Sequence, residues 1–428
     1  MMTMSSALLT DHYELTMLQA ALRSGAAHRR AVFEVFARHL PGGRRYGVVA
    51  GAERVVDALT GFRFGDAELE FLKSTRVVDP PTLAFLADYR FSGNVYGYRE
   101  GDLYFPGSPI MVIEGTFAEA VLLETLTLSI LNHDCAIASA ASRMVHAAGN
   151  RPIIEMGSRR THEIAAVAAA RAAYIAGFAS TSNLMAGHLY GVPTSGTSAH
   201  AFTLVHDDER GAFQAQIDAL GRDTTLLVDT YDVAHAVRVG VELAGAELGA
   251  VRLDSGDLAA VAHEVRGLLD SLGAFDTRIV VTSDLDEYAI AALAAAPVDG
   301  YGVGTALVTG SGAPTAALVY KLVAREDASG EIRPVAKRSV GKPSKGGRKL
   351  AYRQLNAEGI ATAETVITAD RPAPEGRPLL HPLVTNGTPA AADSIQAARE
   401  RHRASMAELP QEAHQLSRGY AAIPTVFD

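Results

Sequence analysis

From residue 150 onward, short apolar runs alternate with Ala-rich stretches, and this alternation constrains the fold more than any other feature of the chain. The apolar runs have the length of strands and lie at residues 153–156, 178–180, 226–228, 251–253, 279–282 and 301–303. Stretches with helical character follow most of them, at residues 161–176, 233–244, 258–272 and 287–295. Repeated strand-then-helix units of this length predict parallel strands joined by crossover helices.

Polar residues and glycines collect where these predicted strands end. They are Glu155, Arg159, Ser182, His200, Asp229, Arg252, Asp254, Ser283, Asp284, Gly302 and Gly304. A (β/α) barrel builds its active site at the carboxyl ends of its strands, and an open doubly wound sheet would place such residues similarly. We favour the barrel, because at least six strand-helix steps are present and no Gly-x-Gly-x-x-Gly turn opens a helix.

The first 118 residues have a different pattern. Strand-like runs at 31–38, 93–98 and 110–114, with a helix expected near 67–73, predict an N-terminal α+β domain over residues 1–118. Residues 119–148 have apolar positions at helical spacing, with Asn132, His133 and Asp134 interrupting the pattern. We place the barrel domain at 119–325 and expect 326–428 to be a C-terminal segment that packs back on the N-terminal domain. Its Pro-, Ala- and charge-rich part from residue 371 is expected to form short peripheral helices.

Composition narrows the class of protein. The chain has 428 residues, 48% hydrophobic and 20% charged, as in ordinary enzymes of two or three folded parts. A single cysteine, Cys135, excludes an internal disulfide framework and a Cys-rich zinc site, so no zinc is expected. A net charge of −9 argues against nucleic-acid binding. Without a signal-peptide or membrane-spanning pattern, we expect a cytoplasmic protein that is not bound to a membrane.

The loop at residues 194–200 ends in the best candidate nucleophile of the chain, His200. A neutral imidazole is a good phosphoryl acceptor, and the small residues Gly196, Thr197, Ser198 and Ala199 let backbone N–H groups approach a polyphosphate. The alternative is that His200 is a hydrogen-bonded structural residue, as histidines in such loops often are.

The most specific local string is Arg252-Leu253-Asp254-Ser255-Gly256-Asp257. Arg252 and Asp254 are two residues apart and therefore share one face of a strand, where they can hold an anionic substrate together with ribose hydroxyls or a metal ion. The alternative is an Arg252–Asp254 ion pair with Asp257 as a helix cap. Gly302-Val303-Gly304-Thr305 is typical of a barrel phosphate loop.

A basic loop at residues 337–353 stands out in an acidic chain. It contains Lys337, Arg338, Lys342, Lys345, Arg348, Lys349 and Arg353 among several glycines. A flexible cationic loop of this kind suits a di- or triphosphate, whereas the alternative is a solvated surface loop.

Taken together, these strings resemble those of the nicotinate phosphoribosyltransferase family over most of the chain. The matching elements occur in order along the chain. They are residues 10–17, 155–160, 182–183, 196–200, 252–257, 302–305 and 319–323. The resemblance implies an irregular (β/α) barrel-like domain joined to an α+β domain that is built from the N-terminal segment and the C-terminal region. It also implies a homodimer in which each active site is completed by the neighbouring subunit.

The reaction implied by the resemblance joins nicotinate to 5-phosphoribosyl 1-pyrophosphate, coupled to ATP hydrolysis with Mg²⁺. His200 would be phosphorylated transiently and Asp229 would orient its ring. Tyr13 of the other subunit would stack on the pyridine, while Arg159 and Arg252 would contact the phosphoribosyl group or the nicotinate carboxylate. Asp254 would hold the ribose or Mg²⁺. Substrate phosphates would be the other ligands of Mg²⁺. The remaining expected contacts are Met156, Thr197, Ser283, Gly302, Gly304 and Thr305 with the substrates, and Lys321, Lys342, Lys345 and Arg348 with the polyphosphates.

Substrate choice turns on Ser182. Relatives that use nicotinamide carry an aspartate there, and a carboxylate would repel nicotinate, so Ser182 favours the acid. Met156 stands where those relatives keep an aromatic ring, and its thioether would pack against the pyridine instead. Two alternatives remain: a relative of the same fold that uses nicotinamide or quinolinate, and a non-catalytic protein that only binds a phosphorylated sugar.

Overall fold

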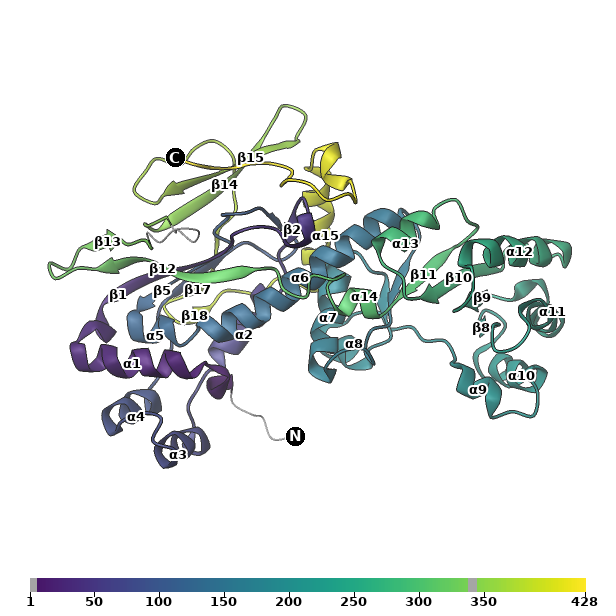
Figure 1. Cartoon of the computed structure of the whole chain (residues 1–428), viewed down its shortest axis with the longest axis horizontal. Helices are drawn as coiled ribbons and strands as arrows, with labels where there is room; N and C mark the ends of the chain where they lie inside the picture. Colours follow the sequence, from purple (N-terminus) through teal and green to yellow (C-terminus); the bar gives the residue numbers. More distant parts are fainter. Residues whose placement is uncertain (1–5, 338–344) are drawn as a thin grey trace. The chain divides into compact units, whose positions relative to one another are not determined.

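The computed structural model describes residues 6–337 and 345–428, which form two compact units (Figure 1). The first, here called the terminal unit, combines Met1–Ser139 with Ala313–Asp428. The second, the central unit, is Ala140–Gly312. Each unit has its own sheets, and the two ends of the chain therefore belong to one fold.

A six-stranded parallel sheet organises the central unit. Its strand order is β7-β6-β11-β10-β9-β8. The strands are β6 (Ile153–Glu155), β7 (Ser180–Thr181), β8 (Thr225–Leu227), β9 (Ala250–Leu253), β10 (Arg278–Ser283) and β11 (Gly300–Val303). Strands β9 and β11 are buried along their whole length, as expected for parallel strands covered on both faces.

Helices follow most of these strands, and acidic or amide side chains cap several of them. The helices are α7 (Glu163–Ile175), α8 (Leu184–Tyr190), α9 (His200–Leu204), α10 (Glu209–Leu220), α11 (Val233–Ala244), α12 (Leu258–Ser271), α13 (Glu287–Ala292) and α14 (Thr305–Val308). Asn183, Asp232, Asp257 and Asp286 each accept a backbone N–H at a helix start. The loops after β7, β8, β9 and β10 thus end in capping residues, which fix where these four loops stop.

This arrangement confirms the predicted barrel-like domain in the form of a curled half-barrel. Within the described residues β7 and β8 are the two edges of the sheet, so the strands do not close into a ring. The second strand begins later than the predicted range of 178–180: Phe178 is a buried core residue just before β7, and pairing to β6 begins at Ser180.

The terminal unit contains the predicted α+β domain, built around a seven-stranded antiparallel sheet. Its order is β13-β12-β1-β5-β3-β17-β18, with β1 (Arg30–Ala37), β3 (Asn94–Gly97), β5 (Met111–Thr116), β12 (Leu318–Glu326), β13 (Ile332–Pro334), β17 (His381–Thr385) and β18 (Thr388–Pro389). Strand β1 lies between β5 and β12, so strands from both ends of the chain share this sheet. A short pair, β2 (Gly47–Val48) and β4 (Leu103–Tyr104), forms a separate ladder.

Helices of the terminal unit come mainly from its N-terminal part. They are α1 (His12–Ser24), α2 (Ala52–Thr60), α3 (Asp66–Ser74), α4 (Pro80–Ala87) and α5 (Phe117–Val121). Helix α6 (Glu124–Ala148) begins in this unit and ends in the central one. No helix among the described residues is both long enough and apolar enough to cross a membrane.

The predicted interruption of α6 at residues 132–134 is wrong. Asn132 accepts the backbone N–H of Leu318, and the buried Asp134 pairs with Arg54 at 2.7 Å and with His133 at 2.8 Å. Because tertiary partners satisfy these polar side chains, they do not compete with the helical backbone, and the helix continues.

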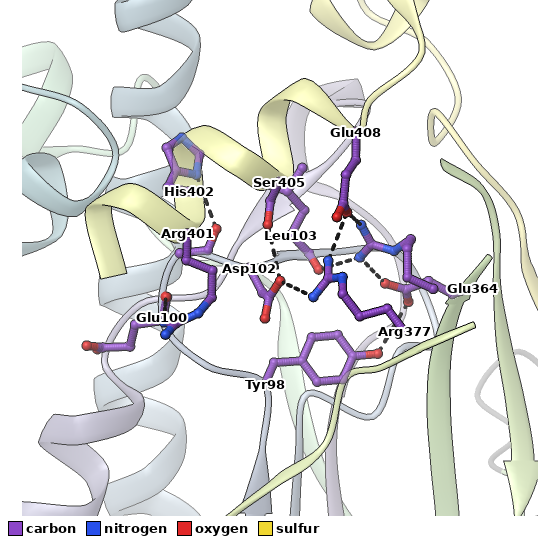
Figure 2. Close-up of polar contacts among 12 residues, drawn as sticks. Tyr98, Glu100, Asp102, Leu103, Glu364, Arg377, Arg401, His402, Ser405 and Glu408 are labelled. Carbon is purple, nitrogen blue, oxygen red and sulfur yellow. Dashed lines mark hydrogen bonds and ion pairs between the residues drawn. The ribbon is translucent and has the colours of Figure 1, made fainter. Parts of the chain in front are cut away.

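The C-terminal region contributes strands as well as helices, so the expected run of short peripheral helices is corrected. A four-stranded sheet has the order β16-β14-β15-β19, with β14 (Lys349–Leu355), β15 (Ala361–Thr368), β16 (Arg377–Pro378) and β19 (Thr425–Phe427). Helix α15 (Ile395–Ala407) lies beside a buried polar network (Figure 2). In this network, Arg377 donates hydrogen bonds to the carboxylates of Asp102 and Glu408, at 2.9 and 2.8 Å. These bonds tie the C-terminal segment to the loop before β4.

Candidate active site

Two pockets in the central unit lie at the carboxyl ends of its parallel strands. The smaller encloses about 170 Å³ and is lined by residues at or just after the carboxyl ends of β6, β9, β10 and β11. The larger encloses about 340 Å³ and is lined by the loop at 195–200 and by residues after β6 and β7. Four residues line both pockets: Met156, Arg159, Arg252 and Asp254. The two pockets therefore adjoin. They suit two ligands whose reacting atoms must come into contact.

The smaller pocket has a floor that only glycine permits. A Cβ on Gly302 would lie 2.5 Å from Cγ2 of Thr282 and 2.7 Å from Sδ of Met156. Gly302 and Gly304 have no side chain between their backbone and the pocket, so a ligand can approach that backbone closely, while Arg159 and Arg160 supply positive charge at the rim. Ser283 has a φ of 147°, a conformation that costs a non-glycine residue about 1–3 kcal/mol and concentrates at functional sites. This combination suits a phosphate.

Arg252 connects the two pockets through its guanidinium group. Its Nε donates to Oγ1 of Thr282 at 2.9 Å and its Nη2 to Oδ1 of Asp254 at 3.1 Å. Its Nη1 donates to Oγ1 of Thr197 at 2.8 Å and to the carbonyl of Ser198 at 3.1 Å. The Arg252–Asp254 ion pair predicted as the alternative reading is therefore present, and Asp257 caps α12 as that reading also expected. The same contacts anchor the 194–200 loop to β9.

A buried carboxyl group shapes the turn after β6. Glu155 is fully buried, and burial raises its pKa above the ordinary value. It accepts the hydroxyl of Thr181 and the backbone N–H of Gly157. Gly157 has no room for a side chain, since a Cβ would lie 2.2 Å from Cγ1 of Val308. Glu155 thereby fixes the backbone that carries Met156 and Arg159 into both pockets.

His200 is the first residue of α9 and lines the larger pocket. Its Nδ1 lies 3.1 Å from Oγ1 of Thr230, and its Nε2 lies 3.8 Å from Oδ1 of Asp229. The side chain of Asp229 is only 3% exposed and accepts from the Ser255 hydroxyl and the Asp254 backbone N–H. The structure thus brings the predicted nucleophile beside the predicted orienting acid.

The remaining predicted contacts of the central unit also line the pockets. Ser182 lies in the larger pocket with Thr197, and Ser283 and Thr305 lie in the smaller one. Ser158 lines the larger pocket as well, and its hydroxyl accepts from the side-chain amide of Asn183 at 2.9 Å. The larger pocket is therefore rich in small hydroxyl side chains.

Tyr13 and Lys321 belong to the terminal unit, where they gather around one carboxylate. Nζ of Lys321 lies 3.7 Å from Oε1 of Glu124. Burial, with the carboxylates of Glu124 and Glu14 next in effect, raises the pKa of Tyr13 to about 12. Tyr13 is 44% exposed, so its ring is available to a ligand or partner.

The described part of the basic loop makes contacts within the terminal unit. Arg348 forms an ion pair with Glu114 and lies over the ring of Tyr96, and Nζ of Lys345 lies 3.5 Å from the centre of the Phe427 ring. Lys342 lies outside the described residues. A role of these three residues with polyphosphates stays a prediction.

The described residues include no group of three His, Cys, Asp or Glu side chains that could hold a metal ion by themselves. The carboxylates of Asp254 and Asp284 do line the smaller pocket, beside the glycine floor. Mg²⁺ in proteins commonly takes one or two carboxylates and completes its shell with substrate phosphates and water. The oxygen donors present fit that ion in that arrangement.

Sequence reasoning missed several residues of this site. Thr282 holds both Arg252 and Asp254, Thr230 contacts His200, and Glu155 was noted only as a strand end. Thr230 and Thr282 each adjoin a residue that was singled out, and their position beside a strand end was the available signal. Glu124 gave no such signal, because its partners Tyr13 and Lys321 are far away in sequence.

Comparisons with known proteins agree with one another. A model of the nicotinate phosphoribosyltransferase N-terminal domain matches residues 8–132. A nicotinate phosphoribosyltransferase of Mycobacterium tuberculosis is 58% identical and covers 98% of this chain and 94% of its own length. One of Bacillus subtilis is 39% identical, over 82% of this chain and 74% of its own. The crystal structure of human nicotinic acid phosphoribosyltransferase matches with a TM-score of 0.85 and 28% identity, over 98% of this chain and 97% of the other.

The half-barrel, with two adjoining pockets at the carboxyl ends of its strands, has the architecture of an α/β enzyme. The 58% sequence identity to the mycobacterial relative, over 98% of this chain, narrows this class of enzyme to one family. The chain belongs to the nicotinate phosphoribosyltransferase family.

Proposed function

We propose that this chain transfers the phosphoribosyl group of 5-phosphoribosyl 1-pyrophosphate to nicotinate, giving nicotinate mononucleotide and pyrophosphate. The observation that carries the proposal is the pair of adjoining pockets that share Met156, Arg159, Arg252 and Asp254. The smaller suits the sugar phosphate and the larger suits the pyridine acid. Membership of the family supports the same assignment.

The chemistry requires cations more than a strong base. The lone pair of the pyridine nitrogen forms a bond to C1′ of the ribose while the bond from C1′ to the pyrophosphate oxygen breaks, and pyrophosphate leaves with the electron pair. Positive charge develops on the sugar and negative charge on the leaving group, so preorganised charges stabilise the transition state. Arg159 at the pocket rim and Arg252 between the pockets provide positive charge, and Asp254, which lines both pockets, would lie beside the sugar. Mg²⁺, when bound with the phosphates, would add positive charge at the leaving group.

His200 is the residue that would couple the reaction to ATP. Its side chain is 41% exposed in the larger pocket, and Asp229 lies behind it. Transfer of the γ-phosphoryl group to the imidazole would place a phosphoryl group with about two negative charges in this pocket. That change can alter the affinity for the substrates between the two states of the enzyme. We assign the phosphohistidine of the proposed cycle to His200.

The second subunit belongs to the same proposal. Tyr13 is exposed and lies in the terminal unit, together with Lys321. We assign Tyr13 to the pyridine site of a partner subunit in a homodimer. Mixed dimers of Tyr13→Ala and His200→Ala chains test this assignment. One of the two sites in each mixed dimer would be intact, so random exchange should restore about a quarter of wild-type activity, and no restoration contradicts shared sites.

A parallel substrate assay tests the proposed function itself. Purified full-length protein with 5-phosphoribosyl 1-pyrophosphate and Mg²⁺ is given nicotinate, nicotinamide or quinolinate, and the nucleotide products are separated. Nicotinate mononucleotide formed at least tenfold faster from nicotinate than any product from the other two supports the proposal. A faster reaction of nicotinamide or quinolinate contradicts it, and so does binding of the sugar phosphate without turnover.

A further inference from the structure

Two consecutive residues of the loop after β8 hold the His200 ring from its two nitrogens. Oγ1 of Thr230 is 3.1 Å from Nδ1, and Oδ1 of Asp229 is 3.8 Å from Nε2. Asp229 is itself fixed, because its Oδ2 accepts from the Ser255 hydroxyl at 2.6 Å and from the Asp254 N–H at 3.0 Å. Its Oδ1 is buried and has no hydrogen-bond partner within the described part of the chain.

The buried Oδ1 atom, 3.8 Å from Nε2, favours the tautomer of His200 that carries its proton on Nε2. An unpartnered carboxylate oxygen needs a donor, and Nε2 is the ring nitrogen of His200 that lies toward it. If Nε2 were unprotonated, its lone pair would face a carboxylate, which is repulsive. With the proton on Nε2, the lone pair lies on Nδ1, and the Thr230 hydroxyl must act as the donor in the contact at 3.1 Å.

We propose that Thr230 is a positioning residue that selects Nδ1 of His200 as the attacking nitrogen and then donates its hydroxyl hydrogen bond to the transferred phosphoryl group. This inference rests on the proposed phosphohistidine. Thr230 occupies the place at Nδ1 that an incoming phosphoryl group must take, so its hydroxyl keeps the ring oriented until ATP arrives. A hydroxyl can rotate from the nitrogen to a phosphoryl oxygen without moving the backbone.

The Nδ1 lone pair forms the N–P bond, the bond from the γ-phosphorus to the bridging oxygen breaks, and ADP leaves with that electron pair. The proton on Nε2 stays in place, and Asp229 stabilises the positive charge that develops on the ring. Water later attacks the phosphorus, and Nδ1 leaves with its lone pair restored.

A purely structural role for Thr230 predicts something different. If the hydroxyl only supported the loop, its removal would lower the melting temperature and would affect every reaction step alike. A positioning role predicts a selective loss in the phosphorylation step. Thr230→Val removes the hydroxyl and keeps the shape of the side chain, whereas Thr230→Ser keeps the hydroxyl.

Labelling of the full-length protein with ATP that carries ³²P at the γ-position tests the proposal. We expect Thr230→Val to slow the appearance of acid-labile label roughly tenfold or more, and Thr230→Ser to stay within about threefold of wild type, at similar melting temperatures. Thr75→Val, which removes a hydroxyl bonded to the Phe71 carbonyl in the terminal unit, is the matched control and should label at the wild-type rate. Phosphorus NMR of the labelled wild type should place the phosphoryl group on Nδ1.

Three outcomes would overturn the inference. They are a wild-type labelling rate in Thr230→Val, an equal loss in Thr230→Ser, or a wild-type phosphoryl group on Nε2. Failure of the underlying proposal looks different: the wild-type protein would then form nicotinate mononucleotide without any label on His200.

Discussion

Nη1 of Arg252 donates a hydrogen bond to Oγ1 of Thr197 at 2.8 Å, and this contact joins a buried strand to the loop that presents His200. The same guanidinium also reaches Thr282 and Asp254. Because Arg252 lines both pockets, one side chain sets the position of the loop relative to the sugar-phosphate site. The geometry of His200 therefore depends on a residue 52 positions away.

Removal of the hydroxyl that receives this bond should loosen the loop. Thr197→Val eliminates a hydrogen bond from a charged donor, worth about 1.5–3 kcal/mol. We expect kcat with nicotinate to fall roughly tenfold or more while the melting temperature changes by only a few degrees, as measured by steady-state kinetics and thermal unfolding. Thr60→Val, which removes a local bond to the Val56 carbonyl in the terminal unit, should leave kcat unchanged. Equal kinetics of the two variants would contradict the anchoring role.

A methyl group at Gly302 should close the smaller pocket. Its Cβ would lie 2.5 Å from Thr282 and 2.7 Å from Met156, and overpacking of this kind costs about 1–3 kcal/mol. We expect Gly302→Ala to raise KM for 5-phosphoribosyl 1-pyrophosphate about tenfold or more. Gly267→Ala, in α12 with open space around the new Cβ, should leave KM unchanged and stabilise the helix slightly. An unchanged KM for Gly302→Ala would argue against a phosphate on this floor.

A charge at position 182 tests how the larger pocket chooses its pyridine. Ser182 is exposed in that pocket, and a carboxylate there would repel the acid group of nicotinate. We expect Ser182→Asp to raise KM for nicotinate at least tenfold and to narrow the preference over nicotinamide. Ser182→Asn has a similar size without the charge and separates repulsion from bulk. Equal effects of the two substitutions would show that charge at this position does not select the substrate.

The buried His402 should make the terminal unit sensitive to acid. Burial lowers its pKa from 6.5 to about 4, and its Nδ1 lies 3.3 Å from the Gly101 carbonyl (Figure 2). Between pH 6.5 and 4 the unfolded chain therefore binds a proton that the folded chain does not, so the stability from this residue is complete above pH 6.5 and is lost as the pH falls toward 4.

Denaturant unfolding at several pH values measures this loss. Over the window from pH 6.5 to 4, His402 should contribute a loss of about 3 kcal/mol, which His402→Asn should not show. Other titrating groups are common to both proteins and cancel in the comparison. Parallel stability curves for the two proteins across this window would refute the assignment to His402.

Local patterns anticipated much of the central unit. Strand-helix alternation placed its strands within a few residues, and the spacing of Arg252 and Asp254 predicted that they share a face, where they form an ion pair at 3.1 Å. Parallel strands bring their carboxyl ends to one edge, which is why residues after β6, β9, β10 and β11 meet in one pocket.

Long-range pairings could not be foreseen in this way. Lys349 and Arg353 belong to the basic stretch, yet in the structure they are buried against Glu34 and Glu364, each at 2.6 Å. A buried charge needs a partner, and the partner of Lys349 comes from β1 at the other end of the chain. The spacing of charged residues alone does not distinguish a phosphate-binding surface loop from buried strand residues that form ion pairs.

Nicotinate turnover in wild type and His200→Ala, with and without ATP, tests the central claim most directly. Nicotinate mononucleotide and ADP are measured together over a series of nicotinate concentrations. The account predicts that ATP raises kcat/KM strongly in the wild type, that ADP forms with the product, and that His200→Ala loses both the stimulation and the coupled ADP. Stimulation by ATP that survives in His200→Ala would contradict the account, because phosphoryl transfer would then not pass through this histidine.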